Sequence, residues 1–372
     1  MKLDRIELYL VENMFDEPWH TAYGSDDGNC VLITRMISGK HEGWSESSPL
    51  PGPNYSYEYG EGIYEIASRF LAPVLIGKEL PDYQTVNNYM KHVKGNPFAK
   101  AGLEMAWWTL KADMDQVPLR YLLGRQEANV LVDRGEGFGI YDTYDNLIER
   151  IGQVIDTGVK RVKLKMAHGW DMEMLAAVRS TFPTQTFHVD CNSSYAPDEI
   201  DYLKQLDKFH LAMIEQPFAL NDFVSHAKLQ KQMDTPICLD EAIVDVISAQ
   251  QAIALGCCRY VNIKPARVGG LGNSLEINRL CQEAGVGCWI GGMLESDVGK
   301  GICAELASIG NMDYPHDISP ECGTYPDPLC SVHLDCPTPW TVRCADHPGT
   351  PIKPDMEKLA SKTIKKVVFD AK

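Results

Sequence analysis

Six short runs of β-branched and apolar residues recur between positions 161 and 296, and each ends on charged or small polar residues. They read RVKLKM, FHVDCN, AMIEQP, ICLDEA, VNIKPAR and WIGGMLES. The charged residues at the ends of the first five runs are spaced by 25, 25, 25 and 24 positions: Lys165, Asp190, Glu215, Asp240 and Lys264. Polar stretches with helical spacing, such as 171–182 and 245–256, separate the runs. The pattern predicts successive βα units, because a buried strand, two turns and a helix need a repeat of this length.

Continuous apolar runs are typical of parallel strands that are buried on both faces. In a (β/α) barrel the carboxyl ends of such strands meet at one mouth, which is where the active site lies. We expect the first barrel strand within 130–142, a helix over 143–158 with Gly158 near its cap, and the last strand near Asp317. The pattern therefore directs Lys165, Asp190, Glu215, Asp240 and Lys264 to one mouth.

The N-terminal third has a different pattern. Alternating residues in 2–12, 29–39 and 41–49 predict antiparallel strands, and apolar residues three and four apart predict helices over 61–75 and 96–114. The last eleven residues, KTIKKVVFDAK, predict a strand that returns to this region. The predicted fold is a modified (β/α)7β TIM-type barrel over 126–321, with an α+β capping domain built from 1–125 and completed by about 322–372.

Two stretches between these elements, 14–28 and 49–60, are rich in Gly, Pro, Asp and Ser, so we predict loops. They also carry Trp19, Tyr23 and Tyr55. Aromatic residues on loops beside a site often form a lid over the substrate. The alternative is that these rings cover the core of the first domain, and the sequence favours neither interpretation.

Three of the strand-end residues are carboxylates. Asp190, Glu215 and Asp240 supply oxygen ligands without histidine or cysteine, which suits Mg²⁺, or Mn²⁺, better than zinc. Neighbouring residues of a strand face opposite sides, so only one of Asp240 and Glu241 is expected to face the mouth. The 25-residue spacing indicates that this residue is Asp240. Asn192 shares a face with Asp190, so it is a candidate for orienting a ligand or contacting the waters of the metal.

The lysines complete the candidate chemistry. Lys163 and Lys165 lie on one face of a buried strand, where each is expected to lower the pKa of the other and yield a neutral amine that can act as a base. Lys264 comes from the far side of the carboxylates. A substrate on the metal would have a lysine on each side, which suits removal of a proton next to a carboxylate. Ion pairs with a purely structural role are the alternative for all six residues, and the regular spacing favours chemistry.

Composition narrows the class of partner. With 44% hydrophobic and 23% charged residues the chain is globular, and its net charge of −16 argues against nucleic acid or an anionic membrane as a partner. We expect no signal peptide, because charged residues interrupt the first apolar run. The twelve cysteines lack the spacing of zinc ligands and indicate buried, free thiols in a cytoplasmic protein. A small carboxylate substrate is the expected partner, and a homo-oligomer is compatible with the sequence.

The motifs together resemble the enolase superfamily, in its muconate lactonising branch, and within it the o-succinylbenzoate synthases and N-succinylamino acid racemases. The resemblance rests on KLK (163–165), HGWD (168–171), VDCN, MIEQP, CLDEA, VNIKPARVGG and GGMLES, with weaker similarity in PWHTAYG and GWSE. It implies that Asp190, Glu215 and Asp240 hold Mg²⁺. It further implies that Lys165 is the acid/base, that Lys163 assists Lys165, and that Lys264 lies on the opposite face. Met293 and Leu294 are implied as substrate contacts.

The resemblance implies a Mg²⁺-dependent lyase of menaquinone biosynthesis that dehydrates 2-succinyl-6-hydroxy-2,4-cyclohexadiene-1-carboxylate. A racemase of N-succinylamino acids or a dipeptide epimerase is the alternative, followed by a muconate-type cycloisomerase, since all begin with the same proton transfer. Ala242, Ala266 and Gly137 depart from the pattern of the family, as does HDISPECGTY. These departures concern the substrate pocket. An alternative of another functional class is a barrel that binds metal and ligand without turnover. A metal-dependent class II aldolase would be expected to use histidine ligands, which these strand ends lack.

Overall fold

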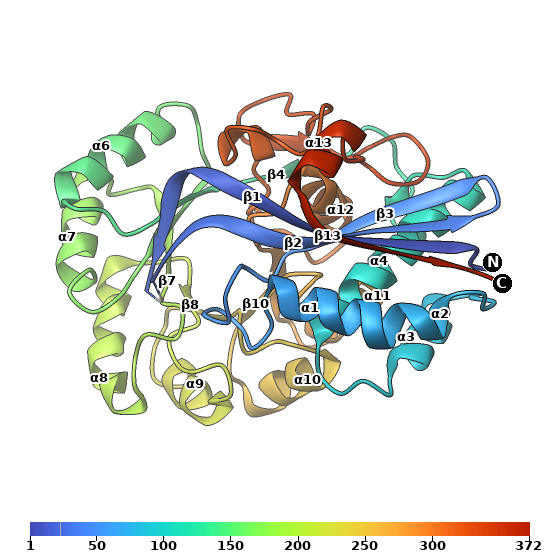
Figure 1. Ribbon diagram of the computed structural model, residues 1–372. Helices are drawn as coiled ribbons and strands as arrows, with labels where there is room; N and C mark the ends of the chain where they lie inside the picture. The colour runs from blue at the N-terminus through green and yellow to red at the C-terminus, as the bar shows by residue number, and fades with distance from the viewer. Residues whose placement is uncertain (23) are drawn as a thin grey trace.

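The capping sheet joins the two ends of the chain. The structure, a computed structural model, describes residues 1–22 and 24–372. An antiparallel sheet of order β13-β1-β2-β3 contains Arg5–Thr21 (β1), Gly24–Ser38 (β2), His41–Ser47 (β3) and Thr363–Asp370 (β13). The final segment pairs with β1, with Arg5 opposite Asp370, and Figure 1 shows the two chain ends side by side.

The stretch 14–28, predicted as a loop, is instead the outer part of the β1–β2 hairpin. The pairing continues to Trp19 opposite Asp26 and to Thr21 opposite Gly24, after a shift of register between Met14 and Trp19. Figure 1 shows both strands leaving the capping sheet and crossing over the barrel. Strands can carry Pro and Asp where they are exposed and where the ladder is interrupted. The polarity that suggested a loop therefore reflects exposure. Tyr23 lies outside the described residues.

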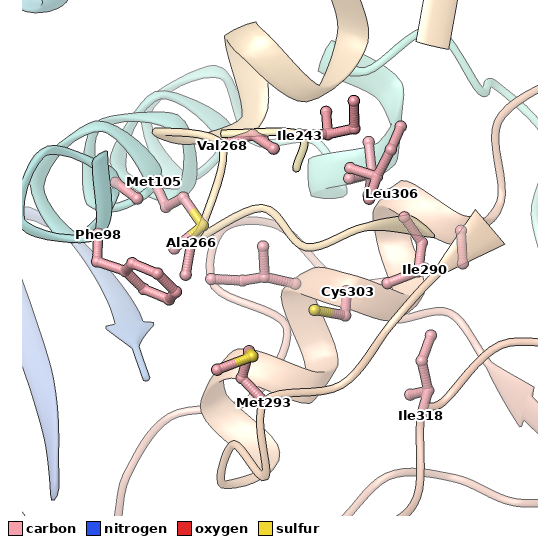
Figure 2. Packing of buried hydrophobic residues seen from close by; sticks show 14 of the residues in the cluster. Phe98, Met105, Ile243, Ala266, Val268, Ile290, Met293, Cys303, Leu306 and Ile318 are labelled. Atoms are coloured by element: carbon pink, nitrogen blue, oxygen red, sulfur yellow. The ribbon is translucent and has the colours of Figure 1, made fainter. Parts of the chain in front are cut away.

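Helices cover one side of the capping sheet. The longest, α4, packs against β3, and a Cβ on Gly43 would lie 2.2 Å from the backbone nitrogen of Leu110, so only glycine permits this approach. Phe98 and Met105 of α4 extend toward Ala266 of the barrel (Figure 2). The helical segments are α1 (Gly60–Ile66), η1 (Ala67–Leu71), α2 (Ala72–Leu75), α3 (Tyr83–Met90), α4 (Pro97–Asp115) and α5 (Leu119–Leu122). The sequence pattern missed α3.

Two buried carboxylates fix the capping domain on the barrel. Glu104 of α4 accepts hydrogen bonds from the backbone N–H groups of Leu271 and Gly272, both at 2.8 Å. Glu46 of β3 accepts from the N–H groups of Ser296 at 3.0 Å and Gly299 at 3.1 Å. Both pairs of donors lie at the start of barrel helices, where N–H groups lack helical partners. The capping domain is thereby held in a defined position over the mouth.

The barrel contains seven parallel strands in the order β11-β10-β9-β8-β7-β6-β5. Register places Lys165 beside Asp190 and Asp190 beside Glu215. The strands are β5 (Glu136–Phe138), β6 (Arg161–Lys165), β7 (Thr186–Asp190), β8 (Ile214–Glu215), β9 (Ile237–Leu239), β10 (Tyr260–Ile263) and β11 (Gly287–Ile290). The helical segments between and after them are α6 (Tyr144–Ile155), α7 (Met172–Thr181), η2 (Pro197–Glu199), α8 (Ile200–Leu203), η3 (Lys204–Phe209), α9 (Phe223–Gln230), α10 (Val246–Leu255), α11 (Leu271–Glu283) and α12 (Asp297–Ala307).

Residues 316 and 317 close the ring. The backbone N–H of Asp317 donates to the backbone carbonyl of Ile290 in β11 at 2.9 Å. The backbone N–H of His316 donates to the backbone carbonyl of Asp133 at 2.9 Å. Beyond this point the chain forms η4 (Glu321–Gly323), β12 (Thr341–Arg343), paired with β4 (Leu131–Asp133), and α13 (Met356–Lys362). The cysteines are free, as predicted, and all but Cys322 and Cys336 are buried. Across 1–22 and 24–372, none of the helices has the length and apolar character needed to cross a membrane.

The closure at His316 predicts a dependence of stability on pH. Burial lowers the pKa of His316 from 6.5 to about 3, and its neutral Nδ1 accepts a hydrogen bond from the Ile290 N–H at 3.0 Å. The folded state therefore binds this proton less well than the unfolded state does. The stabilisation is complete above pH 6.5 and is lost as the pH falls toward 3. At pH 5 we expect a loss of about 2 kcal/mol from this group.

The His316→Asn variant isolates this contribution, since asparagine keeps an acceptor but does not titrate. Denaturant unfolding should show that the variant is less stable than the wild type at pH 8 and loses less stability between pH 8 and pH 5. Equal losses in the two proteins would contradict the prediction.

Candidate active site

The predicted lysines and carboxylates meet at the carboxyl ends of the barrel strands. Lys163 and Lys165 lie on β6, Asp190 ends β7 and Glu215 ends β8. Asp240 and Lys264 directly follow β9 and β10. All six side chains are buried or nearly so. The 25-residue spacing thus corresponds to neighbouring strands.

The two lysines of β6 share Asp190. Its Oδ2 lies 2.9 Å from the Lys163 Nζ and 2.7 Å from the Lys165 Nζ. Lys163 also lies 2.8 Å from Glu215 Oε2, and Lys165 donates to Asn192 Oδ1 at 2.6 Å. Lys163 Nζ reaches Asp317, the residue that closes the ring, at 3.5 Å. The lysine pair is embedded among carboxylates.

This environment corrects one expectation. A lowered pKa is the expectation for both lysines of β6, and for Lys163 this expectation is wrong. Burial does act to lower the pKa of Lys163, but the charges of Asp190, Glu215 and Asp317 outweigh it and raise the pKa. The same contacts hold the pKa of Asp190 well below its usual range, against the effect of burial. Lys163 is therefore a fixed positive charge next to Lys165.

Lys264 forms a second ion pair on the other side of the site. Its Nζ lies 2.9 Å from Asp240 Oδ2 and 3.0 Å from the Tyr55 hydroxyl oxygen, and it lies 4.5 Å from the centre of the Tyr55 ring. Tyr55 donates to Asp240 Oδ1 at 3.0 Å, and Arg267 also binds Asp240. Burial acts to lower the pKa of Lys264, and Tyr55, Glu241 and Glu215 outweigh it and raise the pKa.

Glu241 faces the site together with Asp240, contrary to the argument from strand alternation. Because β9 ends at Leu239, the alternation does not extend to this pair. Gln216 holds the turn by accepting from the N–H groups of Asp240 at 3.0 Å and Ala242 at 3.2 Å. Glu241 Oε1 accepts from Asn192 at 2.9 Å. Burial, with a contribution from Asp190, raises the pKa of Glu241 to about 7.

The donor set fits a hard divalent cation. It consists of buried carboxylates, and an ammonium group already bridges Asp190 and Glu215. In the described part of the chain, Oε2 of Glu241 is buried and has no hydrogen-bond partner. Asp240, however, is turned to Lys264 and Arg267, and the ligand atoms of Asp190, Glu215 and Asp240 do not all lie within 4.8 Å of one another among the described residues.

A second group meets that distance. Asp297, Glu321 and His333 have ligand atoms within 4.8 Å of one another. Their polar atoms are already bonded: Asp297 accepts from the Glu321 N–H at 2.9 Å and contacts His333 Nδ1 at 2.8 Å. Glu321 accepts from the N–H groups of Leu329 and Cys330. This group ties the C-terminal tail to α12.

A cavity of about 960 Å³ lies over the lysines. The β1–β2 hairpin contributes Trp19, and Tyr55, Asn192, Met293 and Leu294 also line it. Asn29 of β2 donates to the carbonyl groups of Met293 at 3.0 Å and Leu294 at 3.2 Å, so the capping domain holds this loop. Gly137 leaves open space, since its nearest neighbour would be the Lys163 Cβ at 4.0 Å. Substrate contact by these residues stays a prediction.

Sequence reasoning gave no role to four residues of this site: Glu241, Arg267, Asp317 and Lys300. Glu241 lies in the CLDEA motif and Arg267 in VNIKPARVGG, so both could have been found from the motifs that carry the resemblance. Asp317 was expected only as the end of a strand. Nothing in the pattern around Lys300 distinguishes it from a residue in the interior of a helix.

The comparisons with known proteins agree with this architecture. The chain matches the family models "Mandelate racemase / muconate lactonizing enzyme, N-terminal domain" over residues 5–124 and "Enolase C-terminal domain-like" over residues 146–356. It is 36% identical to an N-succinylamino acid racemase of Thermus thermophilus, over 86% of each chain. It is also 36% identical to an o-succinylbenzoate synthase of Enterococcus faecalis, over 86% of this chain and 87% of that protein.

A solved structure extends the match to the whole fold. A member of the enolase superfamily from Listeria innocua superposes with a TM-score of 0.94 at 31% identity, over 100% of this chain and 99% of that chain. The capping domain and the barrel both take part in this match. The chain therefore belongs to the enolase superfamily, in its muconate lactonising branch, and is an enzyme.

Proposed function

We propose that this enzyme is an o-succinylbenzoate synthase, which dehydrates 2-succinyl-6-hydroxy-2,4-cyclohexadiene-1-carboxylate. The observation that carries the proposal is the state of Lys264. Asp240 and Tyr55 hold its ammonium group at 2.9 and 3.0 Å, and its pKa is raised. Such a lysine is suited to stabilise negative charge and is a poor base.

In this proposal Lys165 removes the proton α to the ring carboxylate. Asn192 orients the Nζ of Lys165, and Lys264 stabilises the developing enediolate from the opposite side. The hydroxide at the neighbouring ring carbon then leaves with the proton that Lys165 took up, so that water is released and the ring becomes aromatic. Mg²⁺, held by Asp190, Glu215 and Asp240, would supply further positive charge for the enediolate.

The second candidate is an N-succinylamino acid racemase, which would use Lys165 and Lys264 as opposed acid and base. The 36% identity to the racemase of Thermus thermophilus favours it as much as the same identity to the synthase favours the first candidate. The test is to assay purified protein with the cyclohexadiene substrate and with N-succinylamino acids in parallel. Rapid racemisation without any dehydration would overturn the synthase proposal.

The Lys264→Arg variant distinguishes the two chemistries. Arginine keeps the positive charge but is a poor proton donor and acceptor at neutral pH. We expect measurable dehydration to remain, with some loss because arginine is bulkier, while any racemisation disappears. Absorbance of the ring and deuterium exchange at the α carbon measure the two reactions. If the variant kept racemisation, Lys264 would not be the second base.

A further inference from the structure

Lys300 is a buried cation in the wall of the active-site cavity that the mechanism does not use. It lies in α12 and is 5% exposed, and its side chain lines the cavity. The Nζ atom lies 3.6 Å from the point that a Cβ on Gly292 would occupy. Because residue 292 has no side chain, nothing from this position stands between the ammonium group and the cavity.

The ammonium group has few partners within the protein. Its ion pair with Glu295 has a length of 3.8 Å, and Glu295 Oε2 already accepts from the Met293 N–H at 2.9 Å. Within the described residues, Lys300 Nζ donates no hydrogen bond. The other lysines that line the cavity each have an oxygen within 3.0 Å: Lys163, Lys165 and Lys264. A buried ammonium group needs hydrogen-bond acceptors, so an acceptor is missing on the cavity side of Lys300.

The position of Lys300 relative to the chemistry defines what it would bind. The seven strands and the closing segment at 316–317 make a ring of eight positions, in which β11 lies opposite β7. Asp190 ends β7, and Gly292 beside Lys300 follows β11. A substrate that crosses the mouth from Asp190 and Lys165 would bring its far end to Lys300.

We propose that Lys300 binds a second carboxylate at the far end of the substrate, and that this enzyme selects dicarboxylic acids through it. This inference rests on the proposed function, because a succinyl group carries such a carboxylate. It adds a specificity-determining residue that contacts the substrate away from the reacting atoms.

Binding of two ligands tests the inference independently of turnover. o-Succinylbenzoate carries the distal carboxylate, and o-butanoylbenzoate carries a methyl group in its place. By calorimetry, wild-type protein should bind the first ligand about 10- to 100-fold more tightly, the range for a hydrogen bond between charged groups. Lys300→Met should remove this preference, and Lys300→Arg should retain most of it.

Lys100→Met is the matched control, since Lys100 of α4 donates to the Val93 carbonyl and does not line the cavity. It should leave the preference intact. Equal binding of the two ligands by wild-type protein, or a preference that survives in Lys300→Met, would overturn the inference. Absence of both dehydration and racemisation in wild-type protein would instead overturn the proposed function, so the two failures are distinguishable. A melting temperature for each variant identifies any loss of folding.

Discussion

Replacing Lys165 by alanine should lower kcat by at least about 10²- to 10⁴-fold, the usual contribution of a general acid or base. The Nζ atom of Lys165 is the group assigned to remove the α proton, and it is held by Asp190 at 2.7 Å and by Asn192 at 2.6 Å. Deuterium exchange at the α carbon should disappear together with turnover. Both candidate functions share this expectation.

Lys160→Ala is the control for this variant. Lys160 immediately precedes β6, is exposed, and pairs with Asp133 on the outside of the barrel. Its loss should leave kcat almost unchanged. Normal exchange in Lys165→Ala would remove this lysine from the proton transfer.

Removing the divalent metal should abolish activity, and Mg²⁺ or Mn²⁺ should restore it. Spectroscopic titration of metal-free protein with Mn²⁺ should find one site. Asp190→Asn and Glu215→Gln should each lower the affinity for Mn²⁺ by more than about 100-fold, since mutation of residues that only hydrogen-bond to a metal ligand already lowers metal affinity by about 10- to 100-fold. This measurement does not depend on catalysis.

The group of Asp297, Glu321 and His333 supplies the control. Asp297→Asn should leave Mn²⁺ affinity intact, because Asp297 ties the tail to α12. Loss of binding in this variant with normal binding in Glu215→Gln would relocate the site. Asp240→Asn and Glu241→Gln, measured in the same way, identify which of the two neighbours is the third ligand.

The regular part of the molecule was predictable because one physical pattern repeats. The strands β6 to β10 are mostly buried, and each ends on a charged residue or is directly followed by one, so the runs from Lys165 to Lys264 predicted both the strands and the mouth. The prediction weakened where local geometry departs from the ideal. The register separated Asp240 from Glu241, but the strand stops one residue earlier, and both reach the site.

Contacts between distant segments were the other limit. Glu46 and Glu104 resemble ordinary surface acids in the sequence, yet both bind backbone N–H groups of barrel helices. The raised pKa of Lys163 depends on Asp190, Glu215 and Asp317 together, so the spacing of two lysines on one strand did not reveal it. In the hairpin over the mouth, the polar composition of 14–28 suggested a loop, because exposed strands and irregular loops are both rich in polar residues.

Because this hairpin crosses over the barrel, the cavity wall and the candidate catalytic lysines come from different parts of the sequence. The side chains proposed for proton transfer, Lys165 and Lys264, lie at strand ends of the barrel, whereas Trp19 of β1 lines the same cavity from the hairpin of the capping sheet. A substitution in the hairpin alters the cavity wall without touching the acid/base pair. We therefore expect substitutions in the hairpin to change substrate preference while the lysines at the strand ends keep their places.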